Sequence, residues 1–138
     1  EKLEKKNNIK QILITSNTLS SSKLMLKYKL KKTLHQFFPI DSKYLVNKFL
    51  NHWNPSLAVF IESEIWPHMM FGIKKRNIPL ILINGRITKK TFKNWKKFSF
   101  LSKNIFKLFN LTLAQNKTSE NFVWYFQNSL LYSLIWFK

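Results

Sequence analysis

Short apolar runs alternate with helical patterns along the 138 residues of the chain. A short apolar run is typical of a buried β-strand, and apolar residues three or four apart are typical of a helix. The pattern predicts strands at residues 12–15, 36–38, 57–61, 80–83 and 111–114. It predicts helices at 20–32, 42–53, 67–76, 88–109 with a break near Ser99, and 117–126, with Asp41 as the N-cap of the second helix.

Strands that alternate with helices at this spacing predict an α/β fold, a Rossmann-like parallel sheet with helices on both faces. In such folds ligands bind outside the carboxyl ends of the strands. The segments that directly follow the predicted strands are therefore the candidate site: residues 15–22, 39–41, 62–67, 84–88 and 115–118. The chain has 2 Gly, too few for a glycine-rich phosphate loop.

The chain is strongly basic, with 24 Lys and Arg against 6 Asp and Glu and a formal net charge of +18. Such a charge favours polyanionic partners, of which nucleic acid is the obvious one. Only Arg76 and Arg86 are Arg, however, and the abundant Lys, Asn, Ile and Phe all have A/T-rich codons, so part of the charge reflects codon composition. Because readers of phosphates and bases favour the planar fork of Arg, nucleic acid is the less favoured partner.

The charge is unevenly distributed. Residues 1–48 carry +8 (11 basic, 3 acidic), and residues 74–107 carry +11 without an acid. The stretch from Phe49 to Ile73 has no Lys or Arg but holds Glu62 and Glu64. Two of the six acids thus lie two residues apart in the longest stretch free of Lys and Arg, which makes it the first place to look for chemistry.

Composition excludes several classes of protein. An apolar content of 45% with 16% aromatic residues argues against a disordered basic tail. The absence of Cys excludes a disulfide scaffold, thiolate catalysis and a cysteine zinc site. No apolar run approaches the ~20 residues of a membrane-spanning helix. The histidines His35, His52 and His68 lack metal-ligand spacing and are expected to be structural, so neither a metal nor a cofactor is predicted.

Glu62 and Glu64 directly follow a predicted strand and precede Trp66 and the helix-starting Pro67. Carboxylates at the carboxyl end of a strand can accept a proton from a substrate hydroxyl or hold a sugar in place. The alternative is structural, with Ser63 capping the helix and Glu64 stabilising its first turn through the helix dipole. The lack of basic neighbours strengthens the chemical interpretation.

The loop that follows the first predicted strand is rich in hydroxyl groups. Ser16, Thr18 and Ser20 could offer hydroxyl and backbone N–H groups to a phosphate or sugar at a helix N-terminus. The alternative is a cluster of N-cap residues. Asn84 and Arg86 end another predicted strand, where an Arg favours bidentate binding of phosphate or carboxylate. The alternative for this Arg is an ion pair with one of the two glutamates.

The segment 88–100 interleaves aromatic and basic side chains. Basic charge beside aromatic rings suits an anionic membrane surface or nucleic-acid phosphates. The alternative is an aromatic stripe that faces the core, with a solvated basic face. The predicted membrane-surface residues are Lys89, Lys90, Lys93, Trp95, Lys96 and Lys97.

Five segments, in this order, resemble the bacterial 3-deoxy-D-manno-octulosonic acid (Kdo) transferases. They are TSNTLSSSK at 15–23, HQFFPID at 35–41, NPSLAVFIESEIWP at 54–67, INGRITKKTFKNWKKF at 83–98 and LAQNKTSENF at 113–122. The resemblance covers roughly residues 10–122, and its most specific parts are ESEIWP and the NGR segment with the basic helix after it.

The resemblance implies the amino-terminal, acceptor-side half of a two-lobed GT-B glycosyltransferase. That family moves Kdo from CMP-Kdo to the lipid A precursor during lipopolysaccharide synthesis, at the cytoplasmic face of the bacterial inner membrane. A phosphorylated glycolipid and an anionic bilayer would both attract a basic lobe. By position, Glu62 and Glu64 fall on the family's acidic motif and are the implied catalytic residues. The implied acceptor-binding residues are Ser16, Thr18, Ser20, Trp66, Asn84 and Arg86.

The chain also departs from the family pattern. It starts at Glu1 and lacks the family's upstream anchor, the upstream motif that carries the family's catalytic Glu, and the nucleotide-binding lobe. We therefore expect a piece of a longer chain or a processed product that transfers no Kdo alone. We predict an incomplete domain at 10–122, a polar lead-in at 1–9 and a divergent aromatic tail at 123–138. A basic α/β domain that binds membranes or nucleic acid without catalysis remains the alternative.

Overall fold

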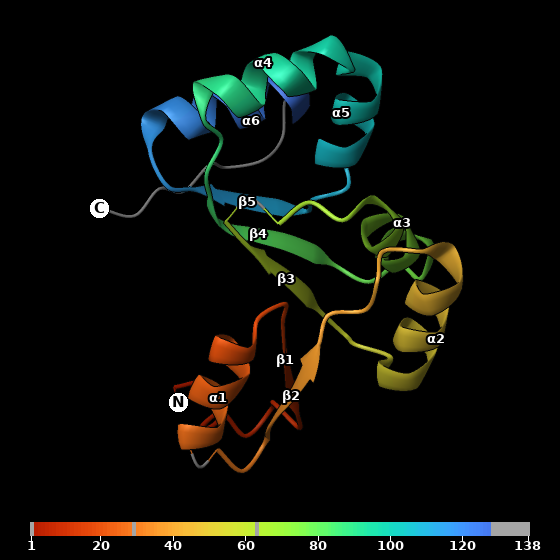
Figure 1. Cartoon of the computed structure of the whole chain (residues 1–138), viewed down its shortest axis with the longest axis vertical. Helices are drawn as coiled ribbons and strands as arrows, with labels where there is room; N and C mark the ends of the chain where they lie inside the picture. The colour runs from red at the N-terminus through yellow and green to blue at the C-terminus, as the bar shows by residue number, and fades with distance from the viewer. Residues whose placement is uncertain (1, 29, 63, 128–138) are drawn as a thin grey trace. The chain divides into compact units, whose positions relative to one another are not determined.

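Each predicted element has a counterpart in the computed structural model, which describes residues 2–28, 30–62 and 64–127 (Figure 1). The predicted α/β fold with parallel strands is therefore confirmed, and the break expected near Ser99 separates two helices. The elements follow in the order β1 (Ile12–Ser16), α1 (Leu19–Lys27), β2 (Thr33–Phe37), α2 (Lys43–Trp53), β3 (Ala58–Ile61), α3 (Pro67–Lys75), β4 (Leu80–Gly85), α4 (Lys89–Lys97), α5 (Ser99–Phe106), β5 (Leu111–Ala114) and α6 (Lys117–Gln127).

Several boundaries differ from the prediction. The helix expected at 20–32 ends at Lys27, because its C-cap Tyr28 takes an extended conformation and β2 begins at Thr33 rather than at residue 36. Asp41 does not cap α2; the neighbouring Ser42 does. Residues 123–127 of the predicted tail belong to α6, and the remainder, 128–138, lies outside the described residues.

The chain divides into two compact units, of which the first is Glu1–Ile40. It contains α1 and a two-stranded parallel sheet in which Ser16 at the end of β1 pairs with Phe37 at the end of β2. The predicted lead-in joins this unit through Glu4. Its carboxylate accepts hydrogen bonds from the backbone N–H groups of Lys31 and Lys32, and one from the Thr33 hydroxyl at 2.8 Å. The lead-in is therefore tied to the start of β2.

These contacts predict a pH dependence. Partial burial acts to raise the pKa of the Glu4 carboxyl, but the hydrogen bonds from Thr33, Lys32 and Lys31 outweigh it and lower the pKa below its ordinary value. A lowered pKa stabilises the folded unit above the unfolded-state pKa, and this stability is lost as the pH falls through the folded-state value. As the pH drops below about 4.5, hydrogen-exchange protection of β1 and β2 should therefore decrease in the natural chain. The decrease should be less steep in Glu4→Gln. Parallel pH profiles would contradict the assignment.

The second unit, Asp41–Lys138, holds the parallel sheet β3-β4-β5 (Figure 1). The strands thus form two sheets rather than one. One face of this sheet buries Phe60 and Leu82, whereas Val59, Ile61 and Ile83 on the other face are 45%, 57% and 39% exposed. The parallel strands of this unit alternate with helices, in agreement with the predicted fold class.

Arg76 joins α2 to α3, which pack side by side (Figure 1). Its guanidinium donates hydrogen bonds to Oδ1 of Asn51 at 2.6 Å, to Oδ1 of Asn47 at 3.3 Å from both terminal nitrogens, and to the carbonyl of Gly72 at 3.1 Å. One of the chain's two Arg residues therefore has a structural role that uses its planar fork.

Arg76→Lys is expected to lower the free energy of unfolding by about 1–2 kcal/mol, because an ammonium cannot make these hydrogen bonds together. Urea unfolding of the chain measures the change. The exposed neighbour Lys75 provides the control, since Lys75→Gln should change stability by less than about 0.5 kcal/mol. Equal effects at the two positions would contradict the role assigned to the fork.

Candidate functional site

The carboxyl ends of β3 and β4 carry two residues with left-handed backbone conformations. Glu62 follows β3 with φ 63°, and Asn84 near the end of β4 has φ 56°. The N–H of Glu62 donates to the carbonyl of Ile83 at 2.9 Å, so the two strand ends lie side by side. Asn tolerates this conformation, but for Glu it costs about 1 kcal/mol or more. An exposed carboxylate held in a strained turn at the edge of a parallel sheet is typical of a functional site.

Glu64 is held in place by Trp66. The indole N–H of Trp66 donates to Oε2 of Glu64 at 2.5 Å, and Trp66 is half-buried whereas Glu64 is exposed. One carboxylate oxygen is thus fixed by a charge-assisted hydrogen bond, and the rest of the group faces solvent. We define the acidic loop as residues 62–66.

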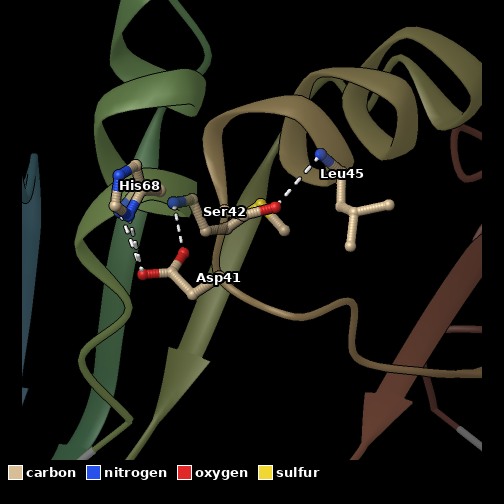
Figure 2. A network of polar contacts seen from close by, with 5 residues as sticks. Asp41, Ser42, Leu45 and His68 are labelled. Carbon is tan, nitrogen blue, oxygen red and sulfur yellow. Dashed lines mark hydrogen bonds and ion pairs between the residues drawn. The ribbon is translucent and has the colours of Figure 1, made fainter.

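The helix after the acidic loop, α3, begins at Pro67 with Trp66 as its N-cap residue. The structural alternative gave the cap to Ser63, which lies outside the described residues. Figure 2 shows that the carboxylate of Asp41 reaches the first turn of α3 instead, where it accepts hydrogen bonds from the N–H groups of His68 and Met69. Sequence reasoning missed this role because Asp41 lies 27 residues before His68.

Asn84 and Arg86 belong to the same edge of the sheet as the acidic loop. The register between β4 and β5 shifts between Leu82 and Gly85, where Asn84 takes its left-handed conformation. Arg86 is exposed, and the following N–H of Ile87 donates to the buried hydroxyl of Ser119 at 3.2 Å. The structure therefore brings the predicted residues of the acidic loop, Asn84 and Arg86 to one edge of the second unit.

Ser16, Thr18 and Ser20 lie in the first unit. The hydroxyl of Ser16 is 2.8 Å from Nε2 of His35, a contact that sequence reasoning missed because the strand register was unknown. The oxygen of Thr18 accepts from the N–H of Ser21 at 3.2 Å and caps α1, as the alternative interpretation of this loop expected. Ser20 is exposed in the first turn of α1. Of the three, only Thr18 serves as a cap.

The basic surface of α4 is solvated, while its aromatic residues face the protein. Trp95 is half-buried and meets the ring of Phe106 edge-on at 5.8 Å. Two aromatic residues directly after α4, Phe98 and Phe100, are 69% and 80% exposed where α4 meets α5. The predicted lysines are all exposed: Lys89, Lys90, Lys93, Lys96 and Lys97.

Within the described residues, no group of three His, Asp or Glu is arranged to hold a metal ion. In that part of the chain, every helix is too short or too polar to span a bilayer.

Glu62→Gly is expected to raise the free energy of unfolding by up to about 1 kcal/mol, because glycine adopts a left-handed backbone without strain. Glu62→Ala keeps the Cβ atom and should give no such gain. Urea unfolding of the two variants makes the comparison. Equal stability of the two variants would show that the turn stores no strain.

Comparison with known proteins gives a consistent result. Residues 1–126 match a family model described as 3-Deoxy-D-manno-octulosonic-acid transferase (kdotransferase). The chain is 39% identical over 107 residues to the 3-deoxy-D-manno-octulosonic acid transferase of Rickettsia felis, a match that covers 78% of this chain and 23% of that protein. It is 36% identical over 84 residues to the probable mitochondrial 3-deoxy-D-manno-octulosonic acid transferase of Arabidopsis thaliana, covering 61% and 19%. The chain thus spans about a quarter or less of the length of these relatives. No solved structure shows significant similarity to it.

Proposed function

Because the chain belongs to the Kdo transferase family, we propose that it forms the acceptor-side lobe of a GT-B glycosyltransferase that moves Kdo from CMP-Kdo to the lipid A precursor. The observation that carries the proposal is the acidic loop, in which a strained Glu62 and a fixed Glu64 project from the carboxyl edge of a parallel sheet. Carboxylates in this position are suited to activate or hold a sugar hydroxyl.

In the proposed reaction, a hydroxyl oxygen of the acceptor attacks the anomeric carbon of Kdo with inversion and without a metal ion. The new carbon–oxygen bond forms as the bond between Kdo and the CMP phosphate breaks, and a carboxylate takes the proton of the hydroxyl. One oxygen of Glu64 already accepts the Trp66 indole N–H, which leaves Glu62 the more available proton acceptor and suits Glu64 to hold the sugar. Arg86, with Asn84 beside it, offsets phosphate charge on the acceptor.

The first unit carries polar residues for which we propose a binding role of their own. The Ser16 hydroxyl, held at 2.8 Å from His35, and the exposed Ser20 are proposed to bind polar groups of the acceptor. Thr18 contributes indirectly, because its side chain caps α1 at the end of this loop.

The basic surface of α4 is proposed to bind the anionic inner membrane at its cytoplasmic face, where the lipid acceptor resides. Five exposed lysines attract anionic headgroups, and the exposed rings of Phe98 and Phe100 are placed to enter the interface. The half-buried Trp95 supports this surface from inside rather than touching lipid. Nucleic acid remains the less favoured partner, since only one of the lysine-rich chain's two Arg residues is exposed.

A chimera tests the function. In it, this chain replaces the matching region of the Rickettsia felis transferase, and mass spectrometry detects Kdo added to the lipid A precursor. We expect the chimera to transfer Kdo from CMP-Kdo and the 138 residues alone to transfer none. A folded chimera that binds CMP-Kdo but leaves the precursor unmodified would contradict the proposal, as would turnover by the 138 residues alone.

A further inference from the structure

The N-terminus of α3 takes its cap from outside the helix. Trp66 is the N-cap residue but makes no side-chain hydrogen bond to the helix, and Pro67 at the first position has no N–H. The N–H groups of His68 and Met69 donate to the two carboxylate oxygens of Asp41, at 3.1 and 2.8 Å (Figure 2). Nδ1 of His68 lies 3.5 Å from the same carboxylate. Asp41 thus supplies both the hydrogen bonds and the negative charge that a helix N-terminus favours.

This cap fixes the end of the acidic loop. The Asp41 side chain is only 13% exposed, and Met69, whose N–H it accepts, is 2% exposed, so the contact is anchored in the core. Trp66 directly precedes the capped turn, and its indole N–H holds Glu64 at 2.5 Å. A series of contacts therefore leads from Asp41 through the first turn of α3 and Trp66 to the Glu64 carboxylate.

We propose that Asp41 is a positioning residue for the acidic loop. By holding the first turn of α3, it keeps Trp66 oriented toward Glu64 and keeps that carboxylate at the edge of the sheet. The inference rests on the acceptor-binding role proposed above for the acidic loop, and it extends that role to a residue that itself touches no acceptor. Without Asp41, the N–H groups of His68 and Met69 lose this acceptor, and the helix turn that follows Trp66 is no longer held in place.

The neighbouring Ser42 provides a matched control. Figure 2 shows its hydroxyl directed to α2, where it accepts from the N–H of Leu45 at 3.4 Å. Asp41→Ala and Ser42→Ala therefore remove one helix cap each from adjacent positions, and both should lower the midpoint of thermal unfolding. Only Asp41 is connected to Trp66 and Glu64, so only its loss should change the acidic loop.

The first test is the indole N–H resonance of Trp66 in the 138-residue chain, assigned by its disappearance in Trp66→Phe. We expect its chemical shift to change in Asp41→Ala and in Glu64→Gln, because the hydrogen bond of the indole N–H is altered in both. The chemical shift should stay the same in Ser42→Ala. Asp41→Asn keeps one carboxamide oxygen as an acceptor and should change the chemical shift by an intermediate amount. This variant provides the test if Asp41→Ala fails to fold. An unmoved Trp66 resonance in a folded Asp41 variant would overturn the inference.

The second test is binding of the chain to the lipid A precursor dispersed in phosphatidylcholine vesicles. We expect Asp41→Ala to weaken binding about tenfold and Ser42→Ala less than about twofold. If Asp41 acts through Glu64, the double variant Asp41→Ala/Glu64→Gln should bind no more weakly than Glu64→Gln alone. Additive losses would overturn the inference. If the natural chain does not bind the precursor, the proposed function fails while the Trp66 resonance still decides the role of Asp41.

Discussion

Glu62→Gln is expected to slow Kdo transfer by the chimera about 100-fold or more, because a positioned general base contributes roughly 10²–10⁴-fold to the rate. Gln has the shape of Glu but cannot take the proton of the acceptor hydroxyl. Glu64→Gln is expected to raise the KM for the lipid acceptor more than it lowers kcat, since Glu64 is proposed to hold the sugar rather than to move its proton. Initial rates over a range of acceptor concentrations separate the two effects.

Glu120 supplies the matched control for these variants. Its carboxylate forms an ion pair with Lys117 at 3.0 Å within α6, so Glu120→Gln should leave transfer within about twofold of the natural rate. Natural rates in both Glu62→Gln and Glu64→Gln would contradict the catalytic assignment of the acidic loop. They would favour the non-catalytic alternative, a basic domain that only binds its partner.

Replacing Lys93, Lys96 and Lys97 with Gln is expected to weaken binding to anionic vesicles more than about 100-fold. All three are exposed on α4, and each basic residue near an anionic membrane contributes about 1 kcal/mol. Sedimentation of the chain with vesicles of phosphatidylcholine and phosphatidylglycerol measures the loss. Phe100→Ser, which removes an 80% exposed ring, should weaken binding further without changing the charge.

The control for this prediction removes the same charge elsewhere. Lys48, Lys74 and Lys75 are also exposed but lie on α2 and α3, so their replacement by Gln should weaken vesicle binding far less. Equal losses from the two triple variants would show that binding follows net charge rather than the α4 surface. Tighter binding of the natural chain to RNA than to these vesicles would favour the nucleic-acid alternative.

Much of the second unit could be predicted because its strands are short and apolar. The runs that became β4 and β5 are bounded by polar residues, and the helix pattern between them showed its own break at Ser99. The predicted start of β2 lies too far along the chain, because Thr33–Phe37 mixes polar and apolar residues. The predicted end of α1 also lies too far along the chain. The spacing of residues 28–32 still fits a helix, whereas the backbone of Tyr28 is already in the β conformation.

The candidate site was predictable only where its signal is local in the sequence. Glu62 and Glu64 stood out because no basic residue surrounds them, and their place after a strand put them at the edge of the sheet. Asp41 looked like a cap for the helix that begins beside it, yet it caps α3, and only tertiary contact shows this. The contact between Ser16 and His35 likewise depends on how two strands pair.

The strong positive charge acquires a more specific meaning in the structure. One exposed set of lysines lies on α4 next to two exposed phenylalanines, while Arg76 is used inside the fold to join two helices. The carboxylates of Glu62 and Glu64 directly follow β3, in the same unit as this basic helix. This arrangement supports the proposed binding of a phosphorylated sugar at an anionic surface.

We propose that this chain recognises the lipid acceptor rather than negative charge alone. The decisive measurement is the affinity of the 138-residue chain for vesicles that contain the lipid A precursor, compared with vesicles of equal charge made with phosphatidylglycerol. We predict tighter binding to the precursor, and that Glu62→Gln combined with Glu64→Gln removes the difference but not the binding to phosphatidylglycerol. Equal affinity of the natural chain for both kinds of vesicle would show that it recognises negative charge alone.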